Sequence, residues 1–169
     1  MDVAVFHNTL YAITDQASIG IVKLNTQTLK FLRMKNKPVL DGSNLKLVST
    51  DNDNLLVVHV KPTLEMEIFM VDLWVMAWFR LKSLGDCALF LGGNSKCYSL
   101  ANPGKWGFDE NCVHLIDKDS PACKVVSVEN EVIKTISLPE NRGPLGAKLY
   151  NIDWCFRSRR DEVGYALHE

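Results

Sequence analysis

Apolar segments and polar turns alternate along the chain in a repeating order. The first kind of segment is an apolar strand that ends in a polar turn, and it occurs at residues 3–8, 45–52 and 88–94. One position within this segment is occupied by Val5, then by Leu47 after 42 residues, and then by Phe90 after 43 more. A near-constant period of this length indicates a repeat protein.

A second apolar segment follows each turn and is expected to return beside the first. It lies at residues 10–13, 55–58 and 113–116. The third copy comes late because residues 96–111, which contain Asn102-Pro103-Gly104, separate it from its predecessor. We expect residues 96–111 to be a loop inserted between two antiparallel strands.

Two further apolar segments complete each unit. β-Branched and aromatic residues dominate them, and Asn, Asp and Gly bound them, which favours strands joined by hairpin turns such as His7-Asn8. Periodicity alone leaves residues 64–81 ambiguous between helix and strand, and their alignment with the other units assigns them to strands. These segments lie at residues 21–26, 29–32, 68–72, 77–81, 125–130 and 132–136.

The pattern therefore predicts an all-β fold at residues 1–140, a partial β-propeller of about three four-stranded antiparallel blades. A closed propeller takes about 4 to 8 blades, so three units predict an open or incomplete ring. Residues 141–169 break the pattern with Asn141-Arg142-Gly143-Pro144. They are expected to form an irregular C-terminal tail.

Composition narrows the classes of function. The 169 residues are 47% hydrophobic, enough for a buried core, and the formal charge of −1 gives no excess to hold nucleic acid or an anionic membrane. The most apolar stretch, residues 68–79, is shorter than the roughly 20 residues of a membrane span. Because the N-terminus carries no secretory signal pattern, we expect the protein in the cytoplasm, the nucleus or both.

The cysteines favour free thiols in a reducing compartment, because there are five of them and no C-x-x-C pair. Cys112 and His114 share a strand face, so with Cys97 or Cys123 they offer a minor alternative, a small metal-binding or hydrolytic domain. No nucleophile motif supports catalysis. We therefore expect no enzyme activity, no cofactor and no bound metal.

Residues 77–94, with Ser83-Leu84-Gly85-Asp86 between a Trp strand and an Ala-Leu-Phe-Leu-Gly strand, resemble the signature of plant F-box proteins that carry a KIB-type β-propeller. Residues 110–115 and 6–13 are similar to further strands of that family, although Glu110 and His114 replace its usual Gly and Tyr. The resemblance covers residues 3–139. It implies a propeller that presents substrates to a cullin-based ubiquitin ligase.

The resemblance implies a protein client as partner. The family's F-box binds a Skp-type adaptor, and this sequence begins directly on a blade strand. We therefore expect the C-terminal propeller part without the F-box, and no binding of a Skp-type adaptor by this chain alone. The alternative within the same class is a stand-alone or truncated propeller without a ligase role.

Aromatic residues are the candidates for client contact. The aromatic residues of interest are Trp74, Trp78, Phe79, Trp106 and Phe108. Large rings on strands are expected to pack between blades. That expectation assigns Trp78, and Phe90 with it, to the core. Because inserted loops carry function more often than scaffold strands, the predicted protein-binding residues are Lys105, Trp106 and Phe108.

Overall fold

The structure is a computed structural model, and it describes residues 1–40, 44–92, 97–116, 122–129 and 132–137. Within these ranges the regular elements are β-strands and one short 3₁₀ helix. The C-terminal tail predicted at residues 141–169 lies outside the described residues. The all-β, partial-propeller prediction is confirmed for the part that is described.

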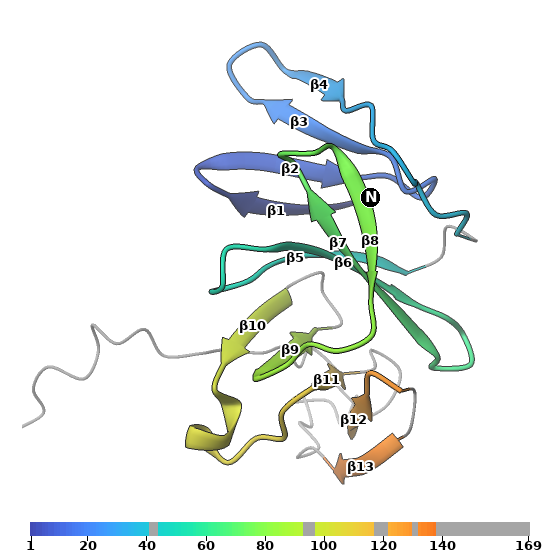
Figure 1. The fold of residues 1–169 in the computed structure, drawn as a ribbon, viewed down its shortest axis with the longest axis vertical. Helices are drawn as coiled ribbons and strands as arrows, with labels where there is room; N and C mark the ends of the chain where they lie inside the picture. Colours follow the sequence, from blue (N-terminus) through green and yellow to red (C-terminus); the bar gives the residue numbers. More distant parts are fainter. Residues whose placement is uncertain (41–43, 93–96, 117–121, 130–131, 138–169) are drawn as a thin grey trace, which may run out of the picture.

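Three sheets of mainly antiparallel strands follow one another along the chain, and the second lies between the first and the third (Figure 1). We call them blades 1, 2 and 3. Blade 1 has the strand order β1-β2-β3-β4 and blade 2 the order β5-β6-β7-β8. Their strands are β1 (Asp2–Phe6), β2 (Thr9–Ile13), β3 (Ile19–Lys23), β4 (Thr28–Phe31), β5 (Leu45–Ser49), β6 (Leu55–Val60), β7 (Met66–Asp72) and β8 (Ala77–Leu81).

Blade 3 departs from the predicted meander. It has five strands in the order β10-β9-β11-β12-β13, and β11 pairs with β9 in parallel. The antiparallel return of β9 is β10, which lies within residues 96–111, so the prediction of a simple loop there is wrong. The elements are β9 (Cys87–Leu91), β10 (Cys97–Ala101), the 3₁₀ helix η1 (Pro103–Trp106), β11 (Cys112–Ile116), β12 (Ala122–Ser127) and β13 (Val132–Ser137).

The innermost strands of the three blades are β1, β5 and β10, because β5 contacts both of the others. The strand that occupies the innermost position of blade 3 is thus β10, not β9. Ser99 of β10 joins the two blades, since its hydroxyl donates to the Ser49 carbonyl and accepts from the Asp51 amide at 3.1 Å. This strand was not predicted because its sequence, Cys-Tyr-Ser-Leu-Ala, shows no clear alternation of apolar and polar residues. All five of its residues are half-buried.

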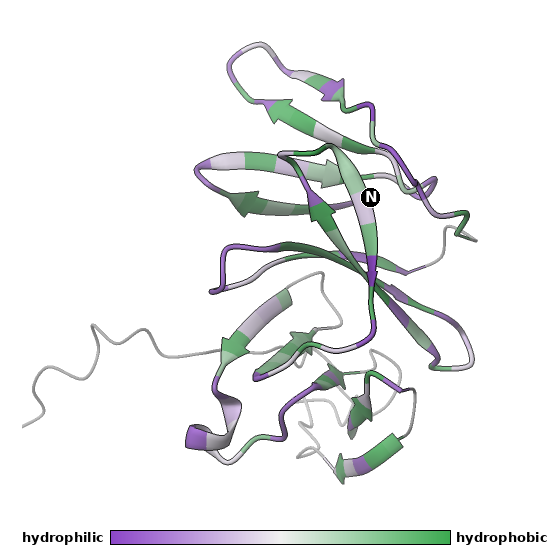
Figure 2. Cartoon of the chain, viewed as in Figure 1, coloured by the Kyte–Doolittle hydropathy of each residue, from purple (hydrophilic) through white to green (hydrophobic). Residues whose placement is uncertain are grey.

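Two hydrophobic cores lie between the blades, and hydrophobic residues lie along the strands of all three sheets (Figure 2). The core between blades 1 and 2 includes Phe6, Ile13 and Trp78. The core between blades 2 and 3 includes Val58, Leu89 and Val113. Because blade 2 is covered on both faces, every residue of its strand β6 is buried.

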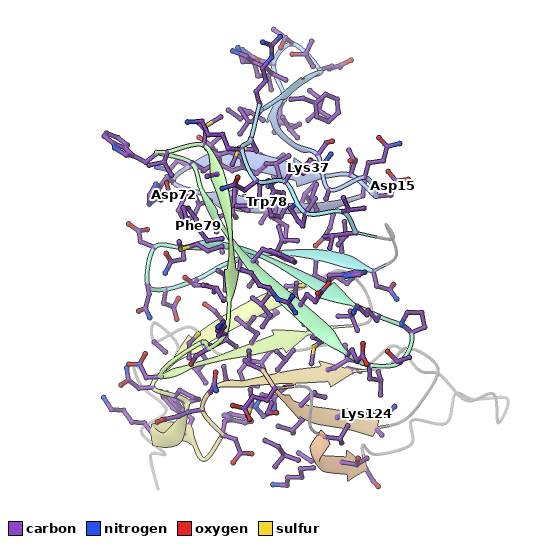
Figure 3. All side chains as sticks on the ribbon, turned by 45° about the vertical axis from the view of Figure 1, so that its right-hand side comes forward. Asp15, Lys37, Asp72, Trp78, Phe79 and Lys124 are labelled. Carbon is purple, nitrogen blue, oxygen red and sulfur yellow. The ribbon has the colours of Figure 1, made fainter. Side chains whose placement is uncertain are left out.

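Turn chemistry agrees with the predicted hairpins. His7 and Asn8 both have positive φ, 45° and 56°, as a two-residue turn that follows the strand twist requires. Residues 66–72 and 77–81 form β7 and β8, so the assignment of residues 64–81 to strands is confirmed. Trp78 and Phe79 lie on opposite sides of β8 (Figure 3), and only Trp78 is buried in the core.

A buried carboxylate ties blade 1 to blade 2. Asp2, at the start of β1, accepts a hydrogen bond of 2.7 Å from the backbone N–H of Leu47 in β5. Leu47 lies on an innermost strand, so this N–H faces the neighbouring blade and not another strand of its own sheet. Asp2 satisfies a donor that burial would otherwise leave without a partner.

Replacing Asp2 with Ala is expected to lower the free energy of unfolding by about 1–3 kcal/mol, because the Leu47 N–H is then buried and unpaired. Asp2→Asn keeps an acceptor oxygen and should cost less than Asp2→Ala. Urea denaturation followed by circular dichroism measures both, with Asp15→Ala in an exposed turn as the matched control. Equal stability of Asp2→Ala and Asp15→Ala would show that this bond contributes nothing.

Candidate protein-binding surface

A hollow opens between blades 1 and 2 at the end of the sheets where their hairpin turns lie. Its volume is about 350 Å³. Three turns meet at it: the β1–β2 turn with His7, the β5–β6 turn with Asp53, and the β7–β8 turn with Trp74. Its lining residues are Phe6, His7, Tyr11, Asp53, Asn54, Leu55, Met70, Val71, Asp72, Leu73 and Trp74.

Trp74 stands out at this hollow because its side chain is 95% exposed. Asp72 orders the turn that presents Trp74. One of its carboxylate oxygens accepts hydrogen bonds from the backbone N–H groups of Trp74, at 2.8 Å, and of Val75, at 3.0 Å. Met76 closes the turn with a left-handed φ of 55°. An indole held in the solvent by an ordered turn is a typical anchor for protein binding.

His7 and Asp53 connect the two blades at the mouth of the hollow. The imidazole Nε2 of His7 and a carboxylate oxygen of Asp53 are 2.6 Å apart, and the His7 ring stacks on Phe6 with a centroid distance of 4.0 Å. Both polar side chains are exposed, so the pair contributes little to stability. Its effect is to hold two turns of different blades next to each other.

The structure places the three predicted binding residues on or just after η1. Lys105 and Trp106 are exposed, whereas Phe108 is half-buried. The Phe108 ring packs edge-on against Phe90, at 5.1 Å, and against His114, at 5.4 Å. The three residues are close in the chain but point to different surroundings: two toward solvent and one onto the outer face of blade 3.

The η1 region lies on the same side of the molecule as the β1–β2 and β5–β6 turns (Figure 1). The Ser99 hydrogen bonds to Ser49 and Asp51 contribute to this placement, since they hold the middle of β10 beside the end of β5. Two exposed indoles, Trp74 and Trp106, therefore belong to turns on one side of the propeller. We call this side the turn face.

Trp74 is one of the candidate aromatic residues in the sequence, but the criterion of an inserted loop predicts Trp106 instead. The available signal was Asp72 two residues before it, because an Asp side chain that accepts from the backbone two residues on marks a turn. The predicted burial of Trp78 and Phe90 is confirmed.

The residues of the metal-site alternative do not all meet. Cys112 and His114 share the outer face of blade 3, as predicted, and Cys123 lies on that face as well. Cys97 instead packs into the core between blades 2 and 3. Within the ranges that the structure describes, no group of three His, Cys, Asp or Glu side chains is placed to hold a metal ion.

Burial sets the protonation of these groups. It raises the pKa of Cys87, of Cys112 and of Cys123, in the last case to about 11. These three thiols are therefore protonated near neutral pH, opposite to the lowered pKa of a reactive cysteine. Burial also lowers the pKa of His114, while the nearby Asp109 carboxylate and backbone oppose the shift.

Comparison with known families gives one match. The model of the KIB1-4 beta-propeller family matches residues 1–144. No curated protein and no solved structure matches the sequence. Among the described residues, no helix has the length and apolar character to span a membrane.

Replacing Phe108 with Ala is expected to destabilise the protein by about 1–3 kcal/mol, because a half-buried ring with two edge-on aromatic partners is lost. Trp106→Ala, two residues earlier on the exposed helix, should change stability by less than about 0.5 kcal/mol. Thermal unfolding of the two variants side by side measures the difference. Equal losses in both would contradict the separate placement of these rings.

The lowered pKa of His114 predicts a loss of stability in acid. A buried imidazole held neutral stabilises the fold above its unfolded pKa of about 6.5, and this contribution disappears as pH falls through the lower folded pKa. The free energy of unfolding should therefore fall as the solution is acidified below about pH 6.5. His114→Phe, which retains a ring beside Phe90, should reduce that slope, and an unchanged slope in urea titrations would contradict it.

Proposed function

Because the chain belongs to the KIB1-4 β-propeller family, we propose that it is a non-catalytic protein-interaction module that holds a client protein on its turn face. Propeller blades give rigid sheets whose connecting turns can vary without disturbing the cores. In this chain the turns, not the strands, carry the exposed indoles. The proposal therefore assigns binding to the β7–β8 turn and the η1 region.

The observation that supports this proposal best is Trp74 beside the hollow of about 350 Å³. In the free protein the exposed indole leaves its apolar surface in water. Covering that surface with a partner is energetically favourable. Because Asp72 already fixes the turn, little conformational entropy is lost when a partner binds. Aromatic anchors of this kind contribute most of the binding energy in many interfaces.

The hollow also indicates the chemistry of the client's anchoring side chain. It is lined by two carboxylates, Asp53 and Asp72, by the rings of Phe6, Tyr11 and Trp74, and by His7, whose Nε2 lies 2.6 Å from Asp53; no Lys or Arg lines it. Aromatic faces and carboxylates together attract a cation. We therefore propose that the client inserts a Lys or Arg side chain between Trp74 and Asp53.

The resemblance of residues 77–94 to plant F-box proteins carries the proposal one step further. In that family a propeller of this type presents its client to a cullin-based ubiquitin ligase. By this reasoning, the protein held on the turn face is a ligase substrate. The turn-face proposal itself does not depend on this step, because it rests on the geometry at Trp74.

Trp74→Ala is expected to weaken client binding by at least about tenfold, the loss typical of an aromatic hot spot. The measurement is affinity capture from extract on the immobilised chain, with quantitative mass spectrometry, followed by calorimetry with each purified captured protein. The specific clients are those that the wild-type chain retains and Trp74→Ala loses. Asp53→Asn should weaken the same clients by a few fold, since one carboxylate near a cation contributes less.

The matched control is Leu24→Ala. Leu24 is 74% exposed and lies in the β3–β4 turn, which is the counterpart in blade 1 of the turn that presents Trp74. Its loss should leave the captured set unchanged. If Trp74→Ala and Leu24→Ala retain the same proteins with the same affinity, the turn-face proposal is wrong.

A further inference from the structure

Strand β4 forms the outer edge of blade 1, and among the described residues it pairs only with β3. Directly after β4, the backbone N–H of Leu32 donates a hydrogen bond of 2.8 Å to the Ile19 carbonyl. Because bonded pairs alternate along an antiparallel ladder, Lys30 also bonds to β3. The backbone N–H and C=O groups of Leu29 and Phe31 therefore point away from the sheet, where they can pair with one more strand.

The outer edge of blade 2 already receives an additional segment. Lys35, in the linker between blades 1 and 2, donates its backbone N–H to the Met76 carbonyl at 2.7 Å and accepts from the Trp78 N–H at 3.1 Å. These bonds make a parallel bridge between Lys35 and Ala77 of β8. An outer edge of this fold thus accepts a backbone-paired segment, and no segment that the structure describes does the same at β4.

The side chains along the edge of β4 and its linker are basic. Figure 2 shows hydrophilic residues in β4 and along the linker that follows it. Residues 16–40 contain no Asp or Glu, although the whole chain has a formal charge of −1. Their five cations are all exposed, and none forms an ion pair with another described residue: Lys23, Lys30, Arg33, Lys35 and Lys37. Cations without counter-charges attract an anionic partner.

The two sides of β4 differ in chemistry. Lys30 lies opposite Ile21, which packs toward the core between blades 1 and 2, so Lys30 is on the side of β4 that faces blade 2. Leu29 and Phe31 are on the other side. A strand added at this edge would place its side chains beside those of β4, and acidic residues next to Lys30 with apolar residues next to Leu29 and Phe31 would match them. This contact is lateral, so it does not require either face of the sheet to be uncovered.

We propose that the outer edge of β4 binds an extended segment of another protein, in which acidic and apolar residues alternate, as a fifth strand of blade 1. The unpaired backbone groups supply the hydrogen bonds, and Lys30 and Arg33 select the acidic side chains. Another copy of this edge is a poor partner, because its lysines would lie opposite lysines. A nucleic acid matches the charge but not a backbone edge of alternating N–H and C=O groups.

This binding is separate from client binding on the turn face, because the hollow beside Trp74 shares no residue with the edge of β4. The strand is only four residues long, so few backbone hydrogen bonds can form. The complex should therefore be weak, with a Kd of about 10–100 µM. Because the cations are exposed, the affinity should fall several-fold when NaCl is raised from about 50 mM to about 500 mM.

Fluorescence anisotropy with the purified chain and a labelled peptide of about eight alternating Val and Glu residues tests the proposal. The comparison peptide alternates Pro and Glu. It has the same charge, but it lacks the N–H groups at the positions that would pair with Leu29 and Phe31. The Val-Glu peptide should bind at least about fivefold more tightly than the Pro-Glu peptide, in proportion to the lost backbone bonds.

Leu29→Pro removes one outward N–H and leaves the ladder with β3 intact, a position at which an edge strand tolerates proline. It should weaken the Val-Glu peptide by up to about tenfold. The matched control is Leu29→Ala, which also removes the leucine side chain but keeps the N–H, and it should bind within about threefold of the wild-type chain. Circular dichroism verifies that both variants are folded.

A second variant tests the charges without changing the backbone. Lys30→Gln combined with Arg33→Gln should weaken the Val-Glu peptide by about fivefold, since two ion pairs are lost. Lys134→Gln, at an exposed position on the outer strand of blade 3, is its control and should bind as the wild-type chain does.

Three results would overturn the proposal. The first is no binding of the Val-Glu peptide up to about 1 mM. The second is equal binding of the two peptides, or equal binding by Leu29→Pro and Leu29→Ala, because the backbone edge would then play no part. The third is tighter binding of a single-stranded RNA of equal charge, which would assign the basic residues to nucleic acid.

Discussion

A four-stranded sheet of this kind has two apolar faces, and it is stable in water only when other elements cover them. Here the covering elements are neighbouring blades. Blade 2 has a hydrophobic core on each side, so residues that would alternate in a half-exposed sheet are buried throughout β6. The contact between successive sheets is therefore the interaction on which the rest of the structure depends.

Packing between blades also fixes where function can lie. Once both faces of a sheet are committed to neighbours, the parts left for a partner are the turns at the ends of the strands and the edge of the outer strand. In this chain those turns are ordered by their own polar contacts: Asp72 holds the Trp74 turn, and His7 and Asp53 join two blades. The cores thus position the turns, and the turns carry the chemistry.

Much of the fold followed from the sequence, because strands that alternate with turns at a fixed period leave a local signal. The period located blades 1 and 2 and the hairpin at His7-Asn8. The period did not predict β10, because this short, half-buried strand lacks the alternation of apolar and polar residues that its neighbours show. Of the three residues predicted to bind a protein, Lys105 and Trp106 are exposed, whereas Phe108 packs onto blade 3, and Trp74 of the proposed surface was not among them.

The sequence by itself determined the repeat, the all-β class and the family resemblance, since each is written in the order and type of neighbouring residues. The tertiary structure alone decided which strand of blade 3 lies innermost, which of the aromatic rings faces solvent, and which outer strand edge takes up the linker. These depend on contacts between residues some 50 positions apart, such as Ser99 with Ser49. A local sequence pattern does not specify these long-range contacts, because strand pairing and blade packing form only when the whole chain folds.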